Sequence, residues 1–357
     1  MPTLLDPLIV GDLTLPNRIV MAPLTRLRAP GAGHVPNALM AGYYRLRASA
    51  GLIITEATPV TPMGVGYDNV PGIWSAEQVE GWKLVTDAVH EAGGRIVMQI
   101  WHVGRISHPY FLDGALPVAP SAVKPAGFVS LVRPQKEFVT PRALETSEIP
   151  GVVEAYRLGA ENAKKAGFDG VELHAANGYL LDQFLQDKTN QRTDAYGGSI
   201  ENRARLLLEA TDAVVSVWGA GRVGVHLAPR GESHDIGDSN PAELFGYVAS
   251  ELGKRKLGFL FVREREGPGA IIHQMKRAFG GVVMANDGFT QETGEQILAS
   301  GDADAVSYGK LYISNPDLVE RFATDAALNE PVPTTFYAEG ATGYTDYPLL
   351  PDAAQAA

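Results

Sequence analysis

The stretch GFDGVELHAANGYLLDQFLQDKTNQRTDAYGGSIENRARLLLE (residues 167–209) joins a short apolar run to a longer amphipathic segment. The run Val171–Ala176 has the length and composition of a buried strand, and apolar positions at 3.6-residue spacing predict a helix at 200–218. Ser199 is a suitable N-cap residue, and Glu201 lies in the first turn, where the helix dipole favours an acid. The stretch therefore predicts one strand-then-helix unit.

The same unit repeats along the chain. The predicted strands are Arg18–Thr25, Leu52–Thr58, Arg95–His102, Val171–Ala176, Arg222–Pro229, Leu257–Arg263, Gly281–Ala285 and Ala303–Tyr308, followed by helices near 36–49, 76–92, 147–166, 200–218, 241–255, 269–279, 290–300 and 315–328. Apolar runs without alternation predict parallel strands that are buried on both faces. Eight units in roughly 310 residues fit an α/β protein with a closed (β/α)8 TIM barrel better than an open doubly wound sheet.

Two segments extend the bare barrel. Residues 5–15 (LDPLIVGDLTL) predict a small N-terminal β-hairpin ahead of the first strand. Residues 103–145 form a long connection after strand three that is rich in Pro and Gly, and connections of this length are usually lids or binding loops. We expect one domain over residues 1–357.

Composition excludes several classes of protein. The 357 residues contain no cysteine, which rules out disulfides, thiolate metal sites and cysteine nucleophiles and suits a reducing cytoplasm. A net charge of -11 argues against nucleic acid or an anionic membrane as partner, because both bind basic surfaces. No signal peptide or membrane-spanning run is visible. We expect a soluble, cytoplasmic protein that is a monomer or small homo-oligomer.

Polar residues gather at the predicted strand ends, where a TIM barrel places its active site. They are Thr25, Glu56, Gln99, Trp101, His102, His174, Asn177, His226, Arg263 and Lys310, and the apolar Ala57 lies beside Glu56 at the end of the second strand. A single histidine or asparagine there is more often structural, but His174, Asn177 and Tyr179 lie within six positions. Together they offer N–H donors for a carbonyl or nitro oxygen and a phenol whose ordinary pKa of about 10 keeps it protonated.

The last two units indicate a phosphate site. MANDGF (284–289) ends strand seven with a glycine turn, and YGK (308–310) ends strand eight with a glycine and a lysine. TIM barrels frequently bind phosphate after these two strands.

Two other patterns are weaker. GAGRVG (219–224) matches G-x-G-x-x-G but precedes a strand instead of joining a strand to a helix, so it does not predict a dinucleotide site. His102, His174 and His226 end successive strands and leave open a metal-dependent barrel hydrolase, although acids are scarce at the other strand ends. We expect no metal.

The chain resembles the Old Yellow Enzyme family of FMN-dependent ene-reductases, and within it the N-ethylmaleimide, xenobiotic and glycerol trinitrate reductase branch. The motifs that carry the resemblance are NRIVMAPLTR (17–26), GLIITEAT (51–58), QIWHVGR (99–105), residues 167–209, NPDL (315–318) and GYTDYP (343–348). They cover the chain from its first residues to about position 350.

The resemblance implies a role for each matching residue. FMN would contact Pro23, Leu24, Thr25, Ala57, Gln99 and His226, with its phosphate at Asn286, Asp287, Gly288, Gly309 and Lys310. The substrate would lie against Tyr67, Trp101 and Tyr344, with its activating oxygen bound by His174 and Asn177. NADPH or NADH would reduce the flavin in the same pocket, and Tyr179 would then protonate an activated alkene, an enone, maleimide or nitroalkene, after hydride transfer.

Two positions depart from the family pattern. His226 stands where strand five commonly ends in an arginine near the flavin, and Lys310 stands where an arginine is frequent at the phosphate. Histidine titrates near neutral pH, and lysine lacks the bidentate fork of arginine. The rival interpretations are the metal hydrolase, a non-catalytic binding protein and a related flavin dehydrogenase that runs the oxidation.

Overall fold

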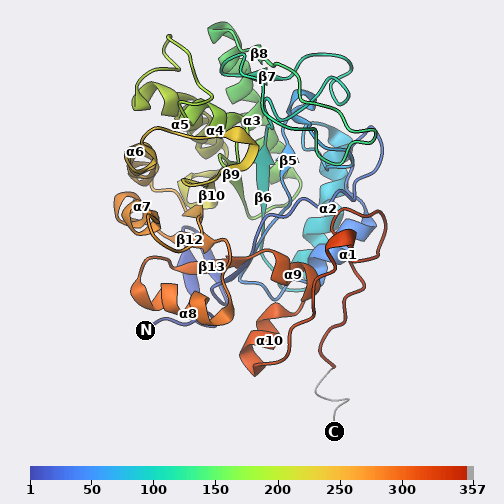
Figure 1. Cartoon of the computed structure of the whole chain (residues 1–357). Coiled ribbons are helices and arrows are strands. Elements are labelled where there is room, and N and C mark those ends of the chain that lie inside the picture. Colours follow the sequence, from blue (N-terminus) through green and yellow to red (C-terminus); the bar gives the residue numbers. More distant parts are fainter. Residues whose placement is uncertain (352–357) are drawn as a thin grey trace.

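A closed barrel of parallel strands forms the centre of the structure (Figure 1). The computed structural model describes residues 1–351, so residues 352–357 of the predicted domain lie outside the described residues. The barrel strands are β3 (Ile19–Met21), β4 (Leu52–Ile54), β6 (Ile96–Trp101), β9 (Gly170–His174), β10 (Val223–Leu227), β11 (Phe259–Arg263), β12 (Val283–Asn286) and β13 (Ala305–Tyr308). Because β3 pairs in parallel with both β4 and β13, and β4 pairs with β6, the sheet closes on itself and confirms the (β/α)8 prediction.

Helices surround this barrel on the outside (Figure 1). They are α1 (Ala38–Arg45), α2 (Ala76–Glu91), α3 (Ile149–Lys165), α4 (Leu180–Leu185), α5 (Ile200–Trp218), α6 (Pro241–Lys254), α7 (Ile272–Phe279), α8 (Gln291–Ser300), α9 (Lys310–Ser314) and α10 (Leu318–Thr324). Single 3-10 turns are η1 (Pro62–Gly64), η2 (Thr146–Glu148), η3 (Ala220–Arg222), η4 (Ser233–Asp235) and η5 (Pro333–Thr335).

The helix starts follow the capping signals of the sequence. Ser199 accepts a hydrogen bond from the Asn202 amide at 3.3 Å, so α5 begins where its N-cap predicts. The helix predicted at 315–328 is shorter, because α10 ends at Thr324 and the next residue, Asp325, has a left-handed φ of 53°. The GAGRVG segment (219–224) forms η3 and the first two residues of β10, so it leads into a strand and does not join a strand to a helix, as the sequence predicts.

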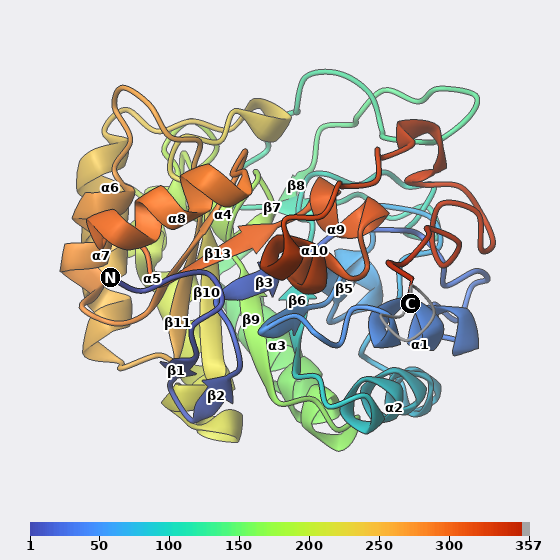
Figure 2. The ribbon, with the colours of Figure 1, turned by 90° about the horizontal axis from the view of Figure 1, so that it is seen from below.

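The predicted hairpin closes the lower end of the barrel. Strands β1 (Leu8–Val10) and β2 (Leu13–Leu15) pair in antiparallel fashion and lie below the barrel in Figure 2. Val10 and Leu15 pack with inward-facing strand residues such as Phe261. Burying one large apolar side chain contributes roughly 1.5–3 kcal/mol to the free energy of unfolding, so the buried face of this hairpin stabilises the protein substantially.

The long excursion covers the opposite end, where the strands have their carboxyl ends (Figure 2). It contains a short parallel pair, β7 (Val118–Ala119) and β8 (Arg142–Ala143), and the short β5 (Thr58–Pro59) extends the sheet beside β6. Arg192 anchors the base of the excursion by donating to the Pro120 carbonyl at 3.0 Å and the Leu144 carbonyl at 2.5 Å. The excursion is therefore held over the barrel mouth.

Within residues 1–351, no helix combines the length and apolar character needed to cross a membrane.

Candidate active site

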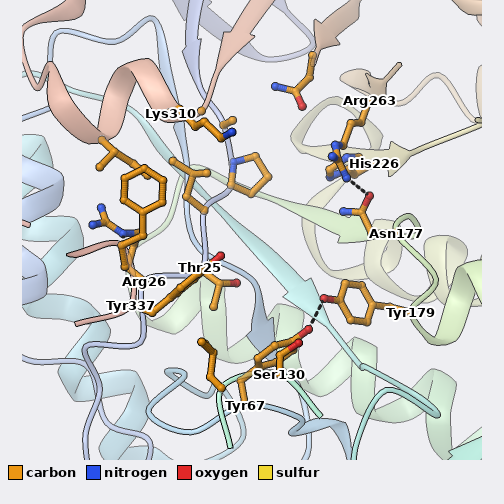
Figure 3. A pocket seen from close by; sticks show the side chains of 18 residues that line it. Thr25, Arg26, Tyr67, Ser130, Asn177, Tyr179, His226, Arg263, Lys310 and Tyr337 are labelled. Atoms are coloured by element: carbon orange, nitrogen blue, oxygen red, sulfur yellow. Dashed lines mark hydrogen bonds between the residues drawn. The ribbon is translucent and has the colours of Figure 1, made fainter. Parts of the chain in front are cut away.

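A cavity of about 520 Å³ opens at the carboxyl ends of the strands (Figure 3). Its size is within the range of small-molecule and cofactor sites. The lining residues come from the barrel strands, the excursion and the C-terminal segment: Ala22, Pro23, Leu24, Thr25, Arg26, Tyr67, Ser130, Leu131, Asn177, Tyr179, His226, Arg263, Asn286, Gly309, Lys310, Ile313, Phe336 and Tyr337. Most of the predicted cofactor contacts and the predicted proton donor therefore share one cavity.

The turn between β9 and α4 is held rigidly. Asn177 and Gly178 have left-handed φ angles of 58° and 77°, which asparagine tolerates and glycine adopts freely. The backbone carbonyl of Asn177 hydrogen-bonds His234 Nδ1 at 2.7 Å, and the Gly178 amide donates to Asp182 Oδ2 at 2.8 Å. These bonds fix the direction in which the Asn177 and Tyr179 side chains project.

His174 lies behind this turn as a neutral donor. Its Nδ1 accepts from the Ala176 amide at 3.3 Å, which leaves the hydrogen of the neutral ring on Nε2. Burial, and after it the nearby Arg263 charge, lowers the pKa of His174 to about 3. The imidazole therefore stays uncharged at neutral pH.

Tyr179 is paired with a second phenol. The Tyr179 and Tyr67 hydroxyls lie 2.9 Å apart (Figure 3). Trp101 packs edge-on against the Tyr179 ring with centroids 4.7 Å apart. Burial, followed by the neighbouring Tyr67, raises the pKa of Tyr179 well above 10. The phenol keeps its proton throughout the physiological range and can serve only as an acid in its resting state.

His226 belongs to a buried neutral group with Gln99 and Glu172. The Gln99 amide nitrogen donates to Glu172 Oε2 at 2.6 Å and to His226 Nδ1 at 3.0 Å, so His226 carries its own hydrogen on Nε2. Burial lowers the pKa of His226 and raises the pKa of Glu172 to about 8. The 3.9 Å approach of Nδ1 to Glu172 is consequently a contact between neutral groups and not an ion pair.

The Nε2 atom of His226 is buried and has no hydrogen-bond partner among residues 1–351. The His226 side chain lines the cavity, so a ligand with an acceptor atom at this wall would complete its bonding. This orphan donor is the most specific sign that the cavity is built to hold a polar ring system.

The predicted phosphate residues divide between two adjoining cavities. Asn286, Gly309 and Lys310 line the main cavity, whereas Asp287 lines a neighbouring one of about 430 Å³. Gly288 has a φ of 89°, and Arg265 Nε lies 3.6 Å from the position that a Cβ would take there. The turn at 286–288 therefore has Lys310 near it on the side of the main cavity and Arg265 near it at Gly288.

Four predicted residues lie behind the cavity wall. Ala57 and His174 are buried, the Gln99 amide nitrogen is engaged by Glu172 and His226, and Trp101 stacks on the rings of both Tyr67 and His174. They support residues that reach the cavity.

Tyr344 lies apart from the wall. It is fully buried and stacks on Tyr43 with ring centroids 4.0 Å apart, while Phe336 and Tyr337 of the same C-terminal segment line the cavity instead. Sequence reasoning missed these two residues because they follow the last barrel unit and no periodic pattern marks them. It also missed Ser130 and Leu131, although the excursion that carries them was predicted as a lid or binding loop.

Two arginines after β3 hold the C-terminal segment in place. Arg26 donates to the carbonyls of Phe336 at 3.0 Å and Gly343 at 2.8 Å, and its NH1 donates to the Tyr43 hydroxyl at 2.9 Å. Arg28 donates to four carbonyls of the segment, those of Phe336 at 2.8 Å, Thr335 at 3.0 Å, Thr342 at 3.2 Å and Gly340 at 3.3 Å. The aromatic wall of the cavity depends on these bonds.

The histidines at the strand ends do not form a metal centre with acids. Among residues 1–351, no group of three His, Cys, Asp or Glu side chains is placed to hold a metal ion. His174 and His226 stack face to face with centroids 5.0 Å apart, and His102 Nδ1 accepts from the Gly104 amide. The geometry gives the hydrolase interpretation no support.

Residues 3–329 match the NADH:flavin oxidoreductase / NADH oxidase family. The chain belongs to this family. Rice (Oryza sativa subsp. japonica) 12-oxophytodienoate reductase 1 is 44% identical over 364 residues, which cover 97% of this chain and 93% of that protein. Arabidopsis thaliana 12-oxophytodienoate reductase 2 is 42% identical over 97% of this chain and 96% of its own length.

Solved structures of the family agree closely with the fold. Morphinone reductase in complex with tetrahydroNAD superposes with a TM-score of 0.95 at 50% identity, covering 99% of both chains. The Old Yellow Enzyme homologue from Zymomonas mobilis has a TM-score of 0.95 at 44% identity, covering 98% of this chain and 100% of that one. This Old Yellow Enzyme family member is an NAD(P)H-dependent flavin oxidoreductase that uses FMN and a nicotinamide coenzyme.

Proposed function

We propose that the chain is an ene-reductase that reduces the C=C bond of enones, maleimides and nitroalkenes with FMN and NADPH or NADH. The observation that carries the proposal is that the Asn177 amide and the protonated Tyr179 phenol line one cavity, with the neutral His174 imidazole packed edge-on against Tyr179 at 5.0 Å between ring centroids. The relatives support the substrate class, because 12-oxophytodienoate and morphinone, from which their names derive, are both oxo compounds.

The described residues fit FMN on chemical grounds. Pro23 and Leu24 offer apolar surface for a ring, the orphan Nε2 of His226 offers a donor at its edge, and Lys310 offers a cation for the phosphate. Thr25 adds a hydroxyl to the same wall. Once reduced by the nicotinamide coenzyme, FMN supplies the hydride.

His174 and Asn177 bind the activating oxygen of the substrate. Both present N–H donors, and negative charge gathers on that oxygen as the β carbon receives hydride, so the two bonds strengthen in the transition state. A neutral imidazole suits this role, since its Nε2–H donates without a competing proton exchange at physiological pH.

Tyr179 delivers the proton to the α carbon. The Tyr67 hydroxyl at 2.9 Å orients it and can pass it a replacement proton. Phe336, Tyr337 and Leu131 line the cavity in which this step takes place. Nitroaromatics and nitrate esters present oxygens of the same kind to the two donors, and we include them in the proposed substrate range.

The visible spectrum of the purified, FMN-loaded protein tests the proposal. Anaerobic NADPH should bleach the flavin bands, and 2-cyclohexenone should then restore them. A protein that binds no FMN, or a bleached flavin that cyclohexenone leaves bleached while oxygen restores it, would contradict the assigned activity.

A further inference from the structure

Arg263 ends β11 beside the oxygen-binding residues, yet it has no role in the function proposed above. Its side chain is 37% exposed and lines the main cavity. Its Nη1 donates to Asn177 Oδ1 at 2.7 Å, and Nε lies 3.6 Å from Asp287 Oδ2. Figure 3 draws the bond from Arg263 to Asn177.

The bond from Arg263 decides which way the Asn177 amide faces. A guanidinium can only donate, so the atom it contacts must be the amide oxygen. The amide nitrogen of Asn177 then points toward the interior of the cavity, as Figure 3 shows. Without Arg263, the amide could turn and present its oxygen, which would repel a substrate carbonyl.

Arg263 is also the charged group of this corner. His174 and His226 stack beside it and are held neutral by burial, and Glu172 behind them has its pKa raised to about 8. The remaining titratable neighbours are Tyr179, which stays protonated, His234, whose pKa is lowered by burial, and Asp287, which faces Nε. Of the cations that line the cavity, Arg26, Lys310 and Arg263, it is Arg263 that bonds the oxygen-binding residue Asn177.

We propose that Arg263 is a positioning residue and the electrostatic partner of the oxygen-binding site, which orients Asn177 and supplies the positive charge that His226 does not. The inference rests on the proposed function, because it concerns the same oxygen. It predicts that the site prefers an anionic oxygen, such as a phenolate or a forming enolate, over its neutral form.

The ionisation of bound 4-nitrophenol measures this preference directly, because the dye changes colour when it loses its proton. We expect FMN-loaded wild type to bind it as the phenolate at a pH where the free dye is largely protonated. Arg263→Gln should weaken phenolate binding by about tenfold to a hundredfold, the range for a lost hydrogen bond to a charged group, and should raise the apparent pKa of the bound dye.

Two further variants test whether the effect comes from the positive charge at position 263, from the shape of the arginine side chain or from the net charge of the protein. Arg263→Lys keeps the cation, so the bound dye should remain ionised as in wild type. Arg157→Gln removes the same charge from α3, where Arg157 pairs with Glu154 and Glu161 outside the cavity, and should leave dye binding unchanged. FMN content, read from the visible spectrum, controls for folding.

The outcomes distinguish the inference from the function beneath it. Wild type that reduces cyclohexenone but binds the dye equally well as Arg263→Gln, with the same apparent pKa, would overturn the role of Arg263 alone. If Arg263→Gln loses FMN, Arg263→Lys decides, since loss of dye ionisation in that variant despite bound FMN would also overturn it. Wild type that fails the spectral test would instead remove the proposed function.

Discussion

Replacing Arg28 with methionine should release the C-terminal wall of the cavity while leaving the barrel intact. Arg28 is buried and lies over the Tyr344 ring at 4.7 Å, and methionine preserves much of that packing volume. The change removes four hydrogen bonds to the segment, to the carbonyls of Thr335, Phe336, Gly340 and Thr342. At about 1 kcal/mol net for each bond, local opening becomes easier by about 4 kcal/mol.

Hydrogen exchange measures this opening. An opening free energy that falls by about 4 kcal/mol speeds exchange by about a thousandfold, because each 1.4 kcal/mol is a factor of ten. The effect should appear at the amides of Tyr344 and Thr345, which donate to the Ala341 carbonyl at 3.0 Å, and not in β9. Since Phe336 and Tyr337 line the cavity, KM for the alkene should rise while FMN stays bound.

Arg277→Met is the matched control, because it removes an exposed guanidinium from α7, far along the barrel surface. Unchanged exchange in residues 335–345 of Arg28→Met would refute the reasoning, as would equal acceleration in β9, which would indicate global destabilisation.

Three further predictions concern the catalytic side chains. Tyr179→Phe should slow the reoxidation of reduced flavin by cyclohexenone about 10²- to 10⁴-fold and spare its reduction by NADPH, as followed by stopped-flow absorbance; equal losses in both half-reactions would count against the acid role. The pKa of His174, lowered to about 3, lies below that of the unfolded chain, so this histidine opposes folding as pH falls below about 6.5, by up to about 1.4 kcal/mol per pH unit until pH approaches 3. Its imidazole NMR signals should accordingly show no titration between pH 5 and 8, and a transition near pH 6.5 would show that the ring is hydrated and charged. His226→Arg should raise the midpoint potential of bound flavin in a redox titration by placing a permanent charge at the wall, and an unchanged potential would end that idea.

Local patterns in the sequence were sufficient to predict the barrel and many of the residues that line the cavity. Strands such as Arg95–His102 are continuous apolar runs, and the observed Ile96–Trp101 lies inside that range because burial on both faces leaves a clear pattern. Residues next to a strand end, such as Thr25 and Asn177, were found because parallel strands all present their carboxyl ends at one mouth.

Contacts between segments that are distant in the chain leave no such pattern in the sequence, so they were not predicted. The sequence predicted that Gln99 contacts the flavin, but it did not predict the hydrogen bonds of Gln99 to Glu172 and His226. Those bonds depend on the register of three neighbouring strands. Tyr337 and Ser130 come from irregular segments whose path is set by bonds such as those of Arg28 and Arg192. Arg263 was visible at the end of its strand, but only its bond to Asn177 distinguishes it from an ordinary surface cation.

Because the barrel closes only when its last strand pairs with its first, the chain cannot complete its fold until nearly all of it has been synthesised. The first strand, β3, needs its second neighbour β13, which follows about 290 residues later and so emerges roughly 15–60 s after it at ordinary rates of translation. Until then, the nascent chain exposes the unpaired edge of an apolar sheet, and such an edge favours association with other chains. The enzyme should therefore depend on chaperones or slow expression for yield more strongly than its finished stability would indicate.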